Sequence, residues 1–521
     1  MAVNNNQKPK EELLWEACDK LRGSVDSAEY KHVVLGLVFL KFISDKFEEQ
    51  RELLIKQGYE RYIENRDAYL RNNVFYVQKE ARWSHLVEHA KQPNIRTLID
   101  NAFDILEKEN KSLQGVLPKN YYSRRELDTI NIGSLIDTVN NINTNGDKEE
   151  DFIGRVYEYF LGKFARQEGK RGGEFYTPKC VVKTITEMIE PYQGKVYDPA
   201  CGSAGMFVQS IKFIKEHQGN VNDISIYGQE KNAGTWRLAK MNLAIRGISA
   251  DLGDMPADTF HNDLHKDLKA DYIMANPPFN QKEWRQDNEL VDDERWIGYV
   301  TPPTGNANYG WILHMVSKLS ENGTAGFVLA NGSLSTETNA EYEIRKQLLE
   351  NDLVECIVSL PEKLFYTTGI PVCLWFITRN KNQRIQRVKT GNKVFRNRQG
   401  EILFIDARKL GTMVDRTLRE LTDEDISKIA TTFHAWRGHN DEGEYKDIQG
   451  FCKSVTIDEI RINNYNLTPG RYVGIEEVEE DEALFSEKME TLSKELFDLF
   501  DKSSKLQECI KEILGALGYE E

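Results

Sequence analysis

The sequence predicts a multidomain chain with α and α/β parts, and three patterns along its 521 residues support this fold class. The first 150 residues carry apolar side chains at helical spacing and few strand-like runs. From 175 to about 380, strand-like runs alternate with amphipathic helices, which indicates a central doubly wound, mostly parallel sheet. Near the C-terminus the apolar period becomes 3.5 residues, typical of a coiled-coil-like helix. We expect an N-terminal helical domain over 1–150, an α/β domain over 151–475 and a C-terminal helical segment over 476–521.

The N-terminal helices are defined by apolar residues three and four positions apart. Helices are expected over 11–21, 33–54, 94–106 and 132–142, and a helix over 149–164 should bridge to the next domain. Leu13, Leu14, Leu37, Leu40 and Phe47 are the expected core residues. The most apolar run, 33–43, contains Lys41 and is too short to cross a bilayer, so we expect a buried helix.

In the α/β domain the strands are short apolar runs that end in turns. Strands are expected near 195–198, 224–228 and 272–275, with a helix that opens at Met206. The later elements are a helix over 310–320, a strand over 324–330, a helix over 340–350 and strands over 353–358 and 372–378. Residues 280–309 are polar and irregular, and a loop of that length is uncommon unless it is functional or disordered.

Bulk composition narrows the possible functions. The formal net charge of −15 argues against a chain that binds nucleic acid by itself, because phosphate backbones favour basic surfaces. Seven scattered cysteines form neither a CxxC motif nor a metal-ligand spacing, so we expect a reducing, cytoplasmic location. The first residues show no signal-peptide pattern.

A basic run interrupts this acidic chain between 379 and 398. It holds eight lysines and arginines and no acid: Arg379, Lys381, Arg384, Arg387, Lys389, Lys393, Arg396 and Arg398. One interpretation is a surface that faces phosphates. The other is a solvated hairpin, because charge runs usually lie in water.

The C-terminal segment has the most regular apolar period of the chain. The repeated positions are Phe485, Met489, Leu492, Leu496, Leu499, Ser503, Leu506, Ile510, Ile513 and Leu517, and only Ser503 is polar. Such a seam either packs on a partner helix or folds back on its own domain. The strict 3.5-residue period favours a helical partner.

The most informative motif is the turn Asn276-Pro277-Pro278-Phe279, which follows an apolar strand. Two prolines fix φ and remove two backbone donors. The Asn276 amide oxygen and the Pro277 carbonyl can then accept from one amine, and Phe279 offers a flat surface beside it. An ordinary Pro-Pro loop is the alternative, because short motifs give false positives.

Two further motifs lie at expected strand ends. A small-residue turn over 198–205 leads from Asp198 into a helix, where glycines allow a ligand to approach the backbone. Its spacing is not that of the dinucleotide fingerprint G-x-G-x-x-G. Glu230 ends the next strand, where a carboxylate can accept from ribose hydroxyls, although a solvated loop acid is the alternative.

These motifs, with Gly173-Glu174-Phe175-Tyr176-Thr177-Pro178 before them and Leu467-Thr468-Pro469-Gly470-Arg471 near the end, occur in an order that resembles S-adenosylmethionine-dependent DNA methyltransferases of adenine N6. More narrowly, nearly the whole chain resembles the modification subunit of Type I restriction-modification systems. The resemblance implies a Rossmann-like methyltransferase sheet and catalysis by Asn276, Pro277, Pro278 and Phe279. It implies cofactor binding by Glu174, Phe175, Tyr176, Thr177, Pro178, Lys179, Asp198, Pro199, Ala200, Gly202, Ser203, Ala204, Gly205, Glu230 and Asp258. Asp258 follows an alanine where the family usually has glycine, so its assignment is the weakest of these.

The resemblance also implies a reaction mechanism and the molecular partners of the chain. Acceptors at the two hydrogens of an exocyclic amine free its lone pair, and the sulfonium donor is already activated, so no metal is expected. Double-stranded DNA is expected to be held by a complex in which two copies of this chain share one specificity subunit. Whether a restriction (nuclease and translocase) subunit joins is open. Cytosine N4 methylation, protein amide methylation and a catalytically silent scaffold are the alternatives.

Overall fold

The structure of the chain, a computed structural model, describes residues 10–23, 27–72, 74–118, 120–123, 129–141, 152–168, 177–217, 219–365, 371–388, 391–416, 418–439, 443–475 and 482–516. It contains two compact units, Met1–Val473 and Gly474–Glu521. Among the described residues, none of the helices combines the length and the hydropathy that a bilayer crossing requires.

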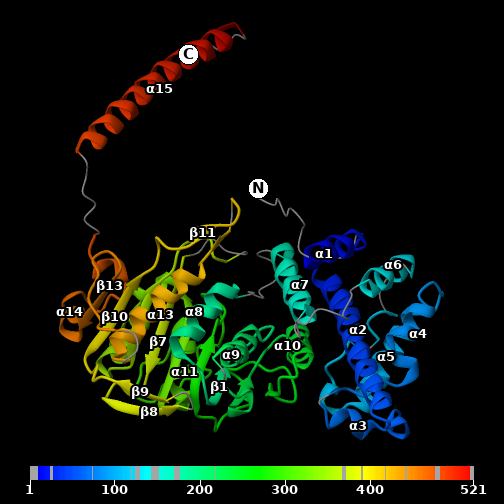
Figure 1. The fold of residues 1–521 in the computed structure, drawn as a ribbon. Coiled ribbons are helices and arrows are strands. Elements are labelled where there is room, and N and C mark those ends of the chain that lie inside the picture. Colours follow the sequence, from blue (N-terminus) through cyan, green and yellow to red (C-terminus); the bar gives the residue numbers. More distant parts are fainter. Residues whose placement is uncertain are drawn as a thin grey trace, which may run out of the picture. The chain divides into compact units, whose positions relative to one another are not determined.

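The N-terminal region is helical, as expected. Its helices are α1 (Lys10–Lys20), α2 (Ser27–Lys56), α3 (Arg66–Leu70), α4 (Trp83–Glu88), α5 (Ile95–Glu109), α6 (Thr129–Asn140) and α7 (Phe152–Glu168). Leu37, Leu40 and Phe47 are fully buried in one core, but Leu13 is 52% exposed, so its assignment to the core was wrong. The same core takes in Val156 of α7 and Leu238 of α10 (Ala233–Ile245), and Figure 1 shows α10 beside α7.

The central element is one mixed sheet of nine strands in the order β13-β10-β6-β7-β5-β4-β1-β2-β3. The strands are β1 (Gly194–Asp198), β2 (Ile224–Gly228), β3 (Ala250–Asp251), β4 (Ala270–Ala275), β5 (Leu319–Ala330), β6 (Val354–Ser359), β7 (Val372–Thr378), β10 (Glu401–Asp406) and β13 (Cys452–Thr456). The half formed by β5, β4, β1, β2 and β3 is parallel throughout. In the other half β7 is antiparallel to both of its neighbours, and β13 is antiparallel to β10.

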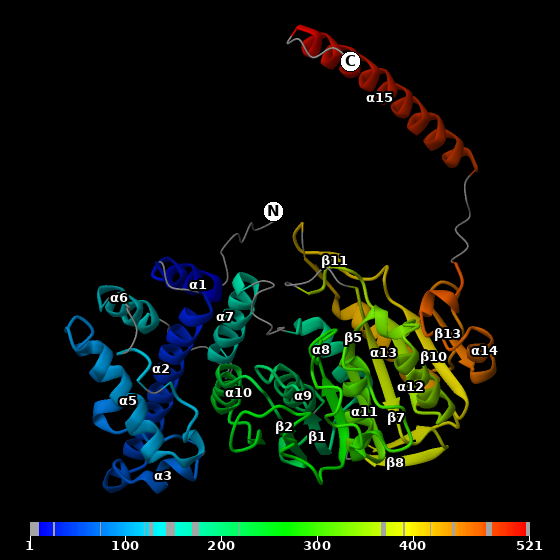
Figure 2. The same cartoon turned by 180° about the vertical axis from the view of Figure 1, so that it is seen from behind.

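Helices cover both faces of the sheet, as Figures 1 and 2 show from opposite sides. One core joins the sheet to α8 (Lys179–Ile189), α9 (Gly205–Glu216) and α13 (Asp423–Arg437). The other core joins it to α11 (Asn308–Lys318), α12 (Asn339–Glu350) and the short α14 (Ile457–Ile462). The expected two-sided α/β architecture is therefore confirmed.

Two arginines organise the long loop 280–309. The guanidinium of Arg285, 8% exposed, donates to the Pro302, Gln286, Asp287 and Glu289 carbonyls. Arg295 pairs with Asp293 at 2.6 Å and donates to the carbonyls of Thr259 and Phe260. Because each buried carbonyl needs a donor, these bonds hold a segment without regular strands in one conformation.

The described part of the basic run 379–398 is mainly structural, and Lys389 lies outside the described residues. It contains the hairpin of β8 (Arg384–Val388) and β9 (Gly391–Phe395). Lys381 and Arg398 are 3% and 0% exposed, and they pair with Asp352 and Glu355 respectively. The interpretation of the whole run as a phosphate-facing surface is therefore wrong for these two residues, since buried, paired cations cannot reach DNA.

The second unit contains the helix α15 (Glu482–Ala516). Along the expected seam, Met489, Leu492, Leu496, Leu499, Leu506 and Ile510 are between 48% and 62% exposed. Phe497 and Phe500, 67% and 57% exposed, widen the apolar surface beyond the heptad positions. The side chains of Phe485 and Ile513, and the whole of Leu517, lie outside the described residues.

Candidate active site

The candidate site lies at the carboxyl ends of β1, β2 and β4, which are adjacent and parallel. Strands in this arrangement end at the same edge of the sheet, so the motifs that follow them come together. A pocket opens there between α8, α9 and α10. It is lined by Glu158, Leu161, Thr177, Lys179, Val182, Asp198, Ala200, Cys201, Gly202, Ser203, Gly205, Met206, Val208, Gln209, Asn242, Arg246 and Asn276.

Asn276 enters this pocket directly from the end of β4. Its side chain is 9% exposed, and its amide Nδ2 donates to Oγ1 of Thr177 over 2.9 Å. Among the described residues, no group donates to the buried Oδ1. A buried amide oxygen without a donor is costly, so the arrangement favours a ligand that brings an N–H or O–H to it.

The other turn residues surround Asn276. Pro277 is buried and Pro278 half-buried. The half-buried ring of Phe279 packs edge-on against Phe365, with ring centroids 5.8 Å apart. The structure therefore brings the four predicted catalytic residues together as one aromatic-tipped turn beside the pocket.

The small-residue turn after β1 needs the left-handed backbone conformation twice. Gly202 has φ 52° and Ala204 φ 68°, and α9 begins directly after them. The Ser203 carbonyl accepts from Asn242 Nδ2 over 2.7 Å, so α10 holds the turn in place. Cys201 is 4% exposed and burial raises the pKa of its thiol, which agrees with a packing residue and not a nucleophile.

Asp198 is a buried carboxyl group without a cationic neighbour among the described residues. Its Oδ1 accepts from the backbone N–H of Ala200 over 2.9 Å. Burial raises the pKa of Asp198 to about 8, and the neighbouring Glu230 adds to this, against the opposing hydrogen bond. Asp198 therefore favours its neutral form at pH 7 until a cation enters the pocket.

Glu230 and Asp258 lie near the pocket but not on its wall. Glu230 accepts from the backbone N–H groups of Gly202 and Asn232, at 3.1 and 2.7 Å. Asp258 pairs with the exposed Lys231 at 2.7 Å. The Ala257 N–H donates to the Glu230 carbonyl over 3.0 Å, which keeps the two acids on adjacent loops.

The remaining predicted cofactor residues divide into three groups. Thr177, Lys179, Ala200, Gly202, Ser203 and Gly205 line the pocket together with Asp198. Pro178, Pro199 and Ala204 are not among its lining residues, and the Pro199 carbonyl accepts from Thr259 Oγ1 over 2.6 Å. Glu174, Phe175 and Tyr176 lie outside the described residues.

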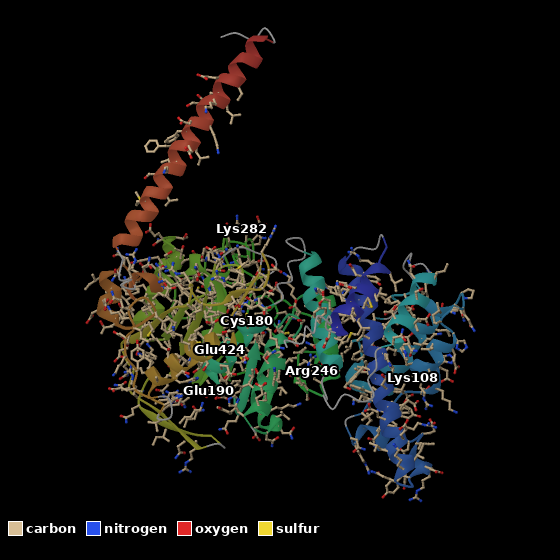
Figure 3. All side chains as sticks on the ribbon, turned by 45° about the horizontal axis from the view of Figure 1, so that its top comes forward. Lys108, Cys180, Glu190, Arg246, Lys282 and Glu424 are labelled. Carbon is tan, nitrogen blue, oxygen red and sulfur yellow. The ribbon has the colours of Figure 1, made fainter. Side chains whose placement is uncertain are left out.

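Sequence reasoning missed the wall that α7 and α10 contribute. Glu158 of α7 lies 3.7 Å from Arg246, which follows α10 and is labelled in Figure 3. The Arg246 guanidinium also donates to Asn242, which holds the small-residue turn. These residues come from helices far apart in the chain and form no local motif, so only the distribution of charge on two amphipathic helices could have suggested them.

Comparison with known proteins identifies the family. The N-6 DNA Methylase family matches residues 148–481, and the HsdM N-terminal domain family matches residues 10–139. The chain belongs to the N-6 DNA methylase family. It is 51% identical over 439 residues to the Type I restriction enzyme HindI methylase subunit of Haemophilus influenzae, covering 82% of this chain and 94% of that protein. It is 42% identical to the MjaIX methylase subunit of Methanocaldococcus jannaschii, covering 98% and 91%.

Solved structures agree with this assignment. The methyltransferase subunit of the type I restriction-modification system of Streptococcus thermophilus superposes with a TM-score of 0.73 at 25% identity, covering 89% of this chain and 99% of that one. The chain is thus a Type I restriction-modification methylase subunit that methylates adenine N6 in DNA. This family assignment selects methylation of adenine N6 over the three alternatives left open by the sequence, which were cytosine N4 methylation, protein amide methylation and a catalytically silent scaffold.

Proposed function

We propose that Asn276 and Phe279 hold the target adenine and that the adjoining pocket binds S-adenosylmethionine. The observation that carries this proposal is the buried Asn276 Oδ1, which has no donor among the described residues. Because Thr177 accepts from Nδ2, the oxygen is the end of the amide left for the substrate. An adenine amine supplies the donor that this oxygen needs.

The chemistry follows from this orientation. The adenine N6 lone pair is delocalised into the ring, so the amine is a weak nucleophile. When Asn276 Oδ1 and the Pro277 carbonyl accept its two hydrogens, the nitrogen becomes more tetrahedral and its lone pair is freed. A neutral amide does this without the desolvation cost of an unpaired carboxylate.

The base must leave the duplex stack to reach this turn. Phe279 then offers a stacking surface, worth on the order of 1–3 kcal/mol per base. S-Adenosylmethionine supplies an activated methyl group when bound. The expectation that no metal takes part in methyl transfer stays a prediction.

The residues on and near the pocket wall fit a cationic, hydroxyl-bearing cofactor. Asp198 is a buried acid whose ionised form a cation would stabilise. The glycine turn leaves room at the backbone, and α9 begins beside it. We assign Glu230 to the ribose and Asp258 to the adenine of the cofactor, with Phe175 as a further contact.

Substitution of the turn separates the two assigned roles. Asn276→Ala should lower the rate of methyl transfer about 10²–10³-fold, the size of effect seen when one preorganised polar group is removed. Phe279→Ala should also lower it, and both variants should bind S-adenosylmethionine with near wild-type affinity in calorimetry. Glu230→Ala is the matched comparison: unlike the two turn variants, it should weaken cofactor binding strongly. Loss of cofactor affinity in both turn variants would show that the turn has been assigned the wrong role.

We further propose that DNA is held by a complex in which two copies of this chain share one specificity subunit. The net charge of −15 and the burial of Lys381 and Arg398 leave the isolated chain a poor duplex binder. The specificity subunit would then choose the target sequence. The mass of the complex from co-expressed chains tests the stoichiometry, and methylation at full rate by the isolated chain contradicts the proposal.

The α15 helix is the proposed docking element for that subunit. Its exposed apolar face, Leu492 and Leu496 with Phe497 and Phe500, is too apolar for a helix that stays in water. Leu492→Glu with Leu496→Glu should abolish co-purification with the specificity subunit, while Lys494→Glu on the opposite face should not. Both variants, and a chain that ends at residue 475, should still bind S-adenosylmethionine.

We propose that the chain consists of three functional segments. Residues 1–150 form the helical domain, 151–475 the methyltransferase domain and 476–521 the assembly segment. The two family matches, which meet between residues 139 and 148, support the first boundary. The compact units, which divide between Val473 and Gly474, support the second.

A further inference from the structure

A second polar cluster lies at the other end of α8, away from the methyl-transfer pocket. Figure 3 labels Cys180 near the beginning of α8 and Glu190 directly after its end. Glu190 adopts the left-handed conformation with φ 50°, a position where glycine is usual. His434 in the last turn of α13 and His439 just beyond it face this carboxylate, and the three ligand atoms lie within 4.8 Å of one another.

His434 is oriented as metal-bound histidines are. Its Nε2 lies 2.9 Å from the Glu187 carbonyl and donates to it, which leaves the lone pair on Nδ1. That Nδ1 lies 3.5 Å from Glu190 Oε2, and His434 is only 5% exposed. No described residue donates a hydrogen bond to Nδ1. A buried lone pair that faces a carboxylate oxygen needs a cation or a proton between the two atoms.

The His439 ring completes a three-ligand set. It lies nearly parallel to the His434 ring, with centroids 4.9 Å apart at 19°, and its Nδ1 lies 4.0 Å from Glu190 Oε2. Because an imidazole binds a metal in its ring plane, one of the two rings must rotate out of this stack to share an ion with the other. Around a tetrahedral zinc ion, ligand atoms at about 2.0–2.2 Å from the metal are separated by roughly 3.3–3.6 Å. The distances of 3.5 and 4.0 Å to Glu190 are close to this separation, so the required movement is a ring rotation and not a shift of the backbone.

We propose that Glu190, His434 and His439 form a binding site for one divalent transition-metal ion of the zinc class. Two imidazoles and one carboxylate suit zinc or cobalt, whereas calcium and magnesium prefer oxygen ligands. The site is separate from methyl transfer. It joins the end of α8 to the end of α13, and α8 begins beside Thr177 and Lys179 of the methyl-transfer pocket.

Lys393 is the competitor for this site. Its ammonium contacts Glu190 Oε2, and it also lies over the Tyr192 ring, 4.5 Å from the centroid. An entering ion must displace this ammonium. Glu190 and Lys393 line a cavity of about 420 Å³, which gives the lysine side chain room to withdraw. The nearby Arg437 and Arg398 are already paired with Glu355, so their charges are partly neutralised.

Zinc binding to the full chain tests the proposal, after treatment with a chelator and dialysis. Metal analysis should find one zinc ion per chain at this site, and zinc should raise the Tm by a few degrees. His434→Gln and His439→Gln should each weaken binding at least ~10-fold. Cobalt in place of zinc should give the absorption of a low-coordinate nitrogen and oxygen site without a thiolate band.

Two variants keep the test decisive if the histidine variants fold poorly. Lys393→Met keeps the apolar stem over Tyr192 and removes the competing charge, so it should bind zinc more tightly than the wild type. His89→Gln is the matched control, because His85, Glu88 and His89 form a more exposed cluster of the same ligand types. Zinc binding that is lost in His89→Gln and unchanged in His434→Gln and Lys393→Met overturns the proposal, as does the absence of zinc binding in the wild type.

Discussion

The two halves of the sheet each bury a carboxyl group, and the two groups differ in their partners and in the direction of their pKa shifts. In the parallel half, Asp198 at the end of β1 has only a backbone N–H as its partner among the described residues, and burial raises its pKa to about 8. In the mixed half, Glu355 of β6 lies between Arg398 and Arg437, at 3.0 and 2.5 Å. Burial alone would raise the pKa of Glu355, but the two arginines bring it to about 2.

This difference separates a binding edge from a structural centre. Glu355 is fully compensated, so a ligand has nothing to add there. Asp198 and Asn276 keep unsatisfied hydrogen-bonding or charge capacity at the pocket wall, which a cofactor cation and a substrate amine can supply. The uncompensated Asp198 and Asn276 therefore lie at the pocket, whereas the compensated Glu355 lies in the structural half of the sheet.

The largest effect is expected at Glu355. Glu355→Ala leaves Arg398 and Arg437 buried without their partner, which should lower the free energy of unfolding by ~3–5 kcal/mol. Denaturant unfolding measures this loss. Glu350→Ala, which breaks the exposed pair with Arg461, is the matched control and should matter much less because solvent screens that pair. Equal losses in the two variants would contradict the role given to Glu355.

The pH dependence of these two acids has opposite signs. The folded pKa of Glu355 lies below its unfolded value, so its contribution to stability is complete above about pH 4.5 and is lost as the pH falls toward 2. The folded pKa of Asp198 lies above its unfolded value, so its contribution is complete below about pH 4 and is lost as the pH rises through 8. In Glu355→Gln the acid-induced loss should shrink, and unfolding followed across pH 2–5 checks it.

The second prediction concerns Asp198 and the cofactor. If S-adenosylmethionine brings a positive charge to the pocket, binding near pH 7 should release up to about one proton, because Asp198 becomes ionised. Asp198→Asn should abolish this release and weaken binding by ~1.5–3 kcal/mol, the size of a charge-assisted hydrogen bond. Calorimetry in buffers of different ionisation enthalpy measures both quantities. An unchanged proton release in the variant would place the titrating group elsewhere.

A smaller effect is expected at Thr177, which orients Asn276. Thr177→Val keeps the shape of the side chain but removes the oxygen that accepts from Asn276 Nδ2. The amide can then rotate so that Nδ2, and not Oδ1, faces the substrate. One neutral hydrogen bond is worth ~0.5–1.5 kcal/mol, which predicts a roughly 2–10-fold lower kcat. Thr177→Ser should restore the rate. A loss confined to the KM for the cofactor would instead make Thr177 a cofactor contact only.

The sequence was sufficient for the parts of the fold that depend on local patterns. The apolar runs located β4, β5, β6 and β7 within a few residues, and the order of motifs after β1, β2 and β4 placed the candidate site at one sheet edge. Short buried strands followed by turns are visible locally, because hydrophobicity and turn residues act within a few positions.

Pairings between segments that are far apart in the chain could not be predicted from local sequence patterns. β10 and β13 extend the sheet beyond β6, yet their place depends on partners far along the chain. Lys381 and Arg398 look like surface cations until β6 brings Glu355 beside them. Glu158 and Arg246 are ordinary helix charges until α7 and α10 meet at the pocket.

The smallest effect is expected within the basic run, where Arg387 contrasts with Arg398. Arg387 is exposed on β8, whereas Arg398 is fully buried and paired. Arg387→Gln should therefore change the free energy of unfolding by no more than ~0.5 kcal/mol. If this edge of the hairpin grips the DNA backbone in the assembled complex, the same variant should lower the slope of log affinity against log salt by about 1. It should do so equally for target and non-target duplexes, because a phosphate contact carries no sequence information. An unchanged slope would show that Arg387 does not contact phosphate in the complex.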